Sequence, residues 1–246
     1  MNMDLSLAVI IAAVFVVAGF VKGVIGLGLP TVAIALLGLV MPPLQAMALL
    51  VVPSLLTNLW QLAAGPRLSM LLQRLWPMLL GICAGTAGGV ALDLQSEHAT
   101  SFLGGVLIVY AAFGLSQLQF RFGKRTEEWV APLAGVATGL LAVASGVLVI
   151  PAVPFLQALD LDKDELVQAL GLSFTVSTLA LAVALAGQGA FHVKDAGVSL
   201  AALLPALIGM GLGQWLRARI AAPVFRRCFF AGLLLLGMHM VVRSYL

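Results

Sequence analysis

The chain has 246 residues, of which 62% are hydrophobic and only 9% are charged, and its formal net charge is +3. Soluble proteins carry about 25% charged residues, so this composition excludes a soluble globular protein and predicts an integral membrane protein. Its apolar stretches are about 20 residues long and do not alternate in polarity, which favours membrane-spanning helices over barrel strands.

Eight apolar segments follow one another along the chain and are separated by short connectors. They predict an all-α integral membrane protein with about eight main transmembrane segments, forming a single membrane transport domain over 1–246. Two segments are longer than one crossing needs and contain glycines and prolines, so we expect broken or re-entrant helices near 19–31 and 135–151. The segments are 5–41, 46–64, 75–92, 99–120, 129–158, 166–188, 196–216 and 225–244.

The first expected break contains a cation and several glycines. Lys22 lies about 17 residues into its apolar segment, and an intramembrane cation indicates a functional site. Two other interpretations remain: Lys22 snorkels to an interface, or it pairs with a carboxylate. Gly26 and Gly28 should end the first helix, and Pro30 suits the first turn of a new helix that would direct unpaired N–H groups at the break.

The second expected break repeats this pattern in weaker form. Ser145 and Gly146 lie near the turn, and two prolines follow at 151 and 154. Polar residues also lie at helical spacing on two other predicted spans, among them Ser54 and Asn58 on the first and Ser177 on the second. Each is either a helix–helix hydrogen bond or part of a cavity lining.

The two halves of the chain resemble each other. Pro77, Gly81 and Gly85 align with Pro205, Gly209 and Gly213 at a constant shift of 128. Other matches, such as Gly19 with Gly135 and Ser54 with Ser177, fall at shifts of 116 to 123. Duplication of this kind is typical of transporter folds, so we predict one repeat over 5–120 and a second over 129–244.

The positively charged residues suggest that the repeats are inverted. If each broken segment returns to the side from which it started, ten Lys and Arg residues lie on one side and two on the other. If each broken segment crosses once, the split is seven to five. Cytoplasmic loops carry the excess of Lys and Arg, so the first arrangement is favoured.

An inverted pair of breaks would make a donor-rich cationic pocket, which suits a small oxyanion. The residues predicted to bind the substrate are Lys22, Gly26, Gly28, Ser54, Asn58, Ser145, Gly146 and Ser177. We expect no catalytic residue and no metal or other cofactor. Cys83 and Cys228 lie in apolar stretches and are predicted to be buried packing residues.

The segment from Gly19 to Pro30, the second glycine-rich segment at 135–154 and the two related halves together resemble the TauE/SafE sulfite-exporter family, also called the four-toluene-sulfonate uptake permease family. The second segment departs from the family pattern, because Ala142, Ala144 and Ser145 stand where several glycines are usual. The resemblance implies movement of sulfite, sulfoacetate, other organosulfonates or related small anions across a bacterial inner membrane.

The expected function is therefore export of small sulfur-containing anions by alternating access, and not catalysis. An anion channel or an uptake permease is the main alternative, and an intramembrane hydrolase using Ser145 and His239 is a remote one. The expected partners are a small anionic substrate and the lipid bilayer. No nucleic acid is expected, and a homodimer remains open.

Overall fold

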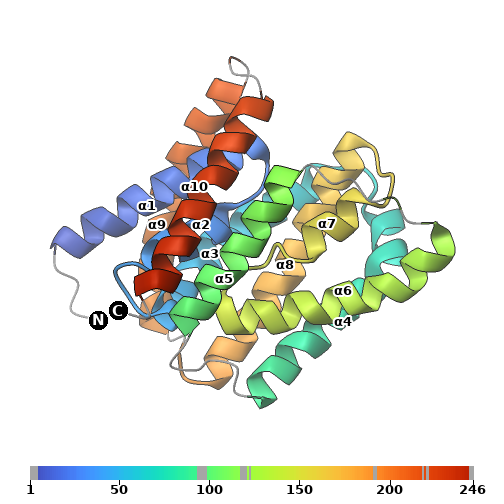
Figure 1. Cartoon of the computed structure of the whole chain (residues 1–246), viewed down its shortest axis with the longest axis horizontal. Coiled ribbons are helices and arrows are strands. Elements are labelled where there is room, and N and C mark those ends of the chain that lie inside the picture. Colours follow the sequence, from blue (N-terminus) through green and yellow to red (C-terminus); the bar gives the residue numbers. More distant parts are fainter. Residues whose placement is uncertain are drawn as a thin grey trace. The chain divides into compact units, whose positions relative to one another are not determined.

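The computed structural model describes residues 5–92, 99–116, 121, 123–190, 193–217, 219 and 222–243, and these residues form an all-α protein (Figure 1). The predicted connector at 93–98 lies outside the described residues, and so do 117–120 of the fourth predicted span. In chain order the helices are α1 (Leu5–Ile25), α2 (Leu29–Leu37), α3 (Pro43–Ala63), α4 (Leu68–Ala91), α5 (Ala99–Ser116), α6 (Lys124–Ser145), α7 (Ala152–Gln157), α8 (Lys163–Gly187), α9 (Val193–Arg217) and α10 (Ala222–Arg243).

The helices have the length and surface of membrane spans. Among the described residues, seven helices are long and apolar enough to cross a bilayer, and Thr100–Ser116 of α5 is a shorter apolar helix. Large apolar side chains such as Leu133, Val183 and Leu204 are more than half exposed. A surface of this kind is unfavourable in water and suits contact with lipid tails. The prediction of an all-α membrane protein is confirmed.

Both predicted breaks are present, and each begins with a glycine in a left-handed conformation. Gly26 has a φ of 88° and donates its N–H to Lys22 O, while Gly146 has a φ of 73° and donates to Ala142 O. Glycine takes this conformation at little cost, which makes it the usual residue after a helix C-terminus. The helices that follow, α2 and α7, are short, with 9 and 6 residues.

The helices divide into two compact units, and each unit takes segments from both predicted repeats. The first unit contains 1–53, 100–116 and 192–246, and the second contains 54–99 and 117–191. The boundary at 53/54 falls inside α3, at Pro53. Proline cannot donate to the carbonyl four residues before it. In the first unit, Ser199 of α9 donates to that carbonyl, Leu49 O, at 2.7 Å and accepts from Val52 N at 3.1 Å.

The first unit contains a parallel pair of helices, α1 and α9, whose backbones touch at glycines. A Cβ at Gly19 would overlap the backbone oxygen of Ala206, and one at Gly23 would overlap that of Met210. Residue numbers rise together along the two helices, so they run in the same direction. Small residues at such a contact let two backbones approach closely enough for van der Waals packing in lipid.

The second unit contains an equivalent parallel pair, α4 and α6. A Cβ at Gly135 would overlap Met78 O, and one at Gly139 would overlap Ile82 O. These contacts correspond to those of α1 and α9 through the shifts found in the sequence. Gly19 and Gly135 differ by 116, while Met78 and Ala206 differ by 128.

Two other pairs run antiparallel, one in each unit. In the first unit, a Cβ at Gly104 of α5 would meet Gly237 O of α10, and one at Gly114 would meet the ring of Phe230. In the second unit, Gly171 of α8 lies against the backbone of Asn58 and Leu62 in α3. Gln168, one turn before Gly171, reaches Leu62 O and the later Gly65 O. In both pairs the residue numbers run in opposite directions.

The prediction that Cys83 and Cys228 are buried is wrong, because both side chains are exposed. A helix that contacts lipid is apolar on its outer face as well as its inner face. Apolar neighbours along the sequence therefore do not distinguish a packed thiol from one that faces the bilayer.

The glycine contacts can be tested with two substitutions in α4. We expect Gly85→Ala to lower stability by about 1–3 kcal/mol, because the new methyl group would overlap the backbone of Val136. Gly88→Ala is the matched control, since its Cβ would meet only Leu140 at 4.0 Å, and it should be neutral or add up to about 1 kcal/mol of helix propensity. Unfolding of the purified protein in detergent measures the stability of both variants. Equal destabilisation by the two substitutions would contradict the close contact between Gly85 and the backbone of Val136.

Candidate functional site

The first break, in the first unit, contains groups that attract a negatively charged ligand. Lys22 is buried in the last turn of α1, one turn before Gly26. Helix α2 starts after Gly28, whose φ is 103°, and this N-cap residue makes no side-chain hydrogen bond to the first N–H groups of α2. Pro30 occupies the first turn of α2, as predicted. An uncapped helix N-terminus carries a partial positive charge and free N–H donors.

Thr31 adds a hydroxyl to this break. It is fully buried in the first turn of α2, and its Oγ1 has no hydrogen-bond partner among the described residues. Sequence reasoning did not select it as a ligand. Its position next to Pro30, as the polar residue of an otherwise apolar return helix, is the signal that could have found it. Lys22, the start of α2 and Thr31 are the candidate donors of the first break, and all three belong to the first unit.

At the second break, in the second unit, the hydroxyl of Ser145 already forms two hydrogen bonds. Ser145 Oγ donates to Leu141 O at 2.7 Å and accepts from Val147 N at 3.3 Å. Beyond Gly146 the chain is apolar until α7 and is buried through Val149, and the six residues of α7 make less than two turns. The return helix is thus much shorter than α6, and the hydroxyl of Ser145 stabilises the end of α6.

The second broken segment returns to its starting point. Arg74 of α4 donates from Nε to Glu127 Oε1 at 2.6 Å and from Nη2 to Glu127 Oε2 at 2.8 Å. Its Nη2 also donates to Leu159 O at 3.0 Å. Glu127 lies in the first turn of α6 and Leu159 follows α7. One guanidinium therefore joins the beginning and the end of the α6–α7 segment, which is a hairpin.

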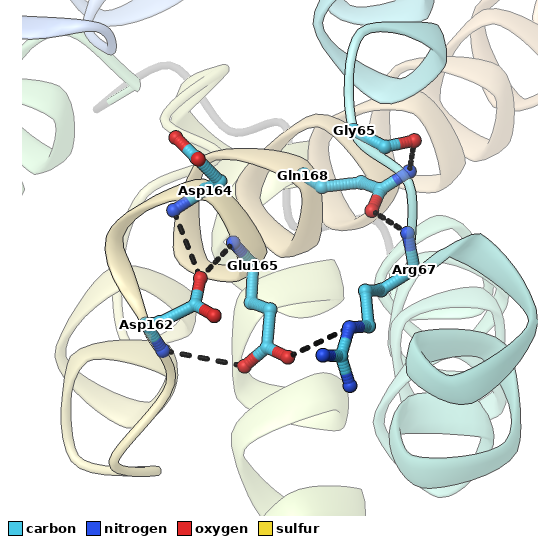
Figure 2. A network of polar contacts seen from close by, with 6 residues as sticks. All are labelled: Gly65, Arg67, Asp162, Asp164, Glu165 and Gln168. Carbon is cyan, nitrogen blue, oxygen red and sulfur yellow. Dashed lines mark hydrogen bonds and ion pairs between the residues drawn. The ribbon is translucent and has the colours of Figure 1, made fainter.

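A second polar network fixes α8 against the end of α3 (Figure 2). The Asp162 side chain caps α8 by accepting from the N–H groups of Asp164 and Glu165, and Glu165 also pairs with Arg67 at 3.5 Å. Gln168 Nε2 donates to Leu62 O and Gly65 O, while its Oε1 accepts from Arg67 N at 2.9 Å. This network sets the register between α3 and α8.

That register brings Ser54 level with Thr178. Residues 171 and 178 lie on one face of α8, two turns apart, and Gly171 touches α3 near Asn58. The α3 atoms nearest to a Cβ at Gly171 belong to Leu62 and Gln61, and moving two turns in the opposite direction along α3 from Gln61 leads to Ser54. Ser54 and Thr178 are fully buried, and neither hydroxyl has a partner among the described residues. Ser173 and Ser177 share this property on another face of α8.

The structure thus brings some of the predicted residues together and leaves others apart. Lys22, Gly26 and Gly28 lie at the first break, in the first unit. Ser54 and Asn58 line the α3–α8 contact of the second unit, while Ser145 and Gly146 form the second break. A pocket formed by both breaks stays a prediction, because these groups belong to different units.

Comparison with known families identifies the class of protein. Residues 11–240 match the family described as sulfite exporter TauE/SafE, so nearly the whole chain is covered. The chain belongs to this family of membrane anion transporters, as the sequence motifs predicted. It is a multi-pass membrane protein. Comparisons with curated proteins and with solved structures give no match.

The buried hydroxyls of Ser54 and Thr178 lead to a test of stability. A buried hydroxyl without a partner costs about 1–3 kcal/mol, so Ser54→Ala and Thr178→Val should stabilise the ligand-free protein or leave it unchanged. Thr138→Val is the control, because Thr138 Oγ1 donates to Ala134 O at 2.7 Å and its loss should destabilise. Unfolding in detergent measures the stability of the three variants. A loss of stability in all three would contradict the finding that the hydroxyls of Ser54 and Thr178 have no partner.

Proposed function

We propose that the protein exports small sulfur-containing anions, such as sulfite or organosulfonates, across a bacterial inner membrane by alternating access. The observation that carries this proposal is the first break, where the last turn of α1 holds the buried Lys22 and the first turn of α2 holds Thr31, whose hydroxyl has no partner among the described residues. Membership of the sulfite-exporter family supports the substrate class. An oxyanion accepts hydrogen bonds from all three kinds of donor.

The charge composition of the first unit supports an anionic substrate. Its segments contain only two acidic residues, Asp4 and Asp195, which lie near the ends of the segments to which they belong. A lysine that is buried among apolar helices is costly unless a negative group offsets its charge. A transported anion near the first break would interact favourably with the Lys22 ammonium during each cycle.

Helix directions support two inverted repeats. If each of α3, α4 and α5 crosses the membrane once, the direction of the chain reverses at α4, at α5 and at α6. If α6–α7 then crossed the membrane once, α8 would run parallel to α3, whereas the two are antiparallel. The antiparallel α5 and α10 lead to the same conclusion. If the second broken segment ends on the side where it began, the parallel directions of α1 and α9 require that the first broken segment also ends on the side where it began.

This arrangement places the cations as the positive-inside rule expects. The connectors α3–α4, α5–α6, α7–α8 and α9–α10 fall on one side, and they carry most of the Lys and Arg residues. We assign that side to the cytoplasm. Export then moves an anion away from a negative interior, and the membrane potential supplies about 2.3 kcal/mol per charge per 100 mV.

Anion flux tests the role of Lys22. In proteoliposomes with labelled sulfite, Lys22→Met should lower transport at least about tenfold, because a hydrogen bond to a charged group contributes about 1.5–3 kcal/mol. Lys163→Met removes an exposed lysine at the start of α8 and should transport normally. Unchanged flux in Lys22→Met would exclude the proposed site. Ohmic single-channel currents in voltage-clamped bilayers would favour a channel over a carrier.

Thiol labelling tests the return of the second break. In a background without Cys83 and Cys228, single cysteines at Arg121, Lys163 and Gln188 are treated with a membrane-impermeant maleimide. The proposed topology puts 121 and 163 on one side and 188 on the other. A segment that crosses once would instead put 121 with 188. Labelling after permeabilisation confirms that all three thiols can react.

A further inference from the structure

Four arginines at the connection between α9 and α10 form a strongly basic surface. Arg217 and Arg219 lie at the end of α9, and Arg226 and Arg227 lie near the start of α10; all four side chains are exposed. The sequence contains no aspartate or glutamate after Asp195. Other basic residues have a carboxylate close by, as Arg74 has Glu127 and Arg67 has Glu165.

The start of α10 does not offset the mutual repulsion of these charges. Arg226 and Arg227 lie in the second turn of α10, and its first turn contains no acidic residue. An anion from outside the chain would relieve this repulsion.

An exposed apolar stripe leads along α9 to the same surface. Ile208, Leu212 and Trp215 recur at positions i, i+4 and i+7, and each is more than half exposed. One turn further, the Arg219 guanidinium lies 3.8 Å from the centre of the Trp215 ring. Stacking on an aromatic ring fixes the guanidinium plane and leaves its edge N–H groups able to bind a phosphate.

We propose that this surface binds an anionic phospholipid. The phosphate accepts hydrogen bonds from the arginines of the α9–α10 connection, and an acyl chain lies along Ile208, Leu212 and Trp215. Apolar side chains that end in arginines match a lipid, which has an apolar tail and a charged head. A free phosphate ion would use the arginines alone. This inference does not depend on the transported substrate.

Thermal unfolding of the full chain in mixed micelles tests the proposal. Phosphatidylglycerol should raise the Tm of the wild-type protein by about 3 °C or more over phosphatidylcholine, because a lipid that binds only the folded state stabilises it. The triple variant Arg217→Gln/Arg219→Gln/Arg226→Gln should lose most of this rise. The charge-matched control, Arg121→Gln/Lys124→Gln/Arg125→Gln, removes three exposed cations from the α5–α6 connection and should keep it.

Three results would overturn the proposal. One is that phosphatidylglycerol raises the Tm of both triple variants equally. Another is that the wild-type protein has the same Tm with phosphatidylglycerol and with phosphatidylcholine. The third is a similar rise on adding inorganic phosphate without phosphatidylglycerol, which would identify a free-ion site. If the triple variant does not fold, the salt dependence of the wild-type protein decides. The rise should disappear near 1 M NaCl, where charges are screened beyond about 3 Å, and a rise that persists would contradict an arginine–phosphate contact.

Discussion

The structure depends on the requirement that backbone N–H and C=O groups be paired or covered inside a bilayer. A helix that stops within the membrane exposes its last carbonyls and the first N–H groups of its successor. In this protein, Gly26 and Gly146 return an N–H to the helix that has just ended. Glycine contacts then bring a neighbouring helix against α1 and α6. The broken segments are held in place by backbone contacts, and few polar side chains are needed.

The same backbone frame carries different chemistry in its two halves. Thr138 stands at the position that aligns with Lys22, and its hydroxyl donates to Ala134 O within its own helix. The hydroxyl of Ser145 likewise forms a hydrogen bond at the second break, whereas the hydroxyl of Thr31 at the first has no partner among the described residues. The groups that could bind an anion at a break are therefore concentrated at the first break. The predicted duplication would allow one half to keep the ligand chemistry and the other to give support.

Much of the fold could be predicted from glycine and proline positions. Gly26, Gly28 and Pro30 mark the first break because no other residues combine those conformations so readily. The short length of α7 could not be predicted, since the apolar residues after Gly146 suit a buried extended segment as well as a helix. Gln168 and Arg74 were missed for another reason: their roles depend on carbonyl and carboxylate groups about 50 to 100 positions away in the sequence. The exposed cysteines show that hydrophobicity alone does not separate lipid-facing from protein-facing sides.

Pro53 has a consequence for how α3 can change shape. In an ordinary helix, a bend stretches the hydrogen bond that joins residue i to the carbonyl of residue i−4. At Pro53 that bond cannot form, and Leu49 O accepts from Ser199 of α9 instead. Bending α3 between Leu49 and Pro53 therefore breaks no bond within the helix at that step. Helix α3 contributes residues to both compact units, and the boundary between its two parts lies at Pro53. At this boundary α3 can bend more easily than a helix without proline.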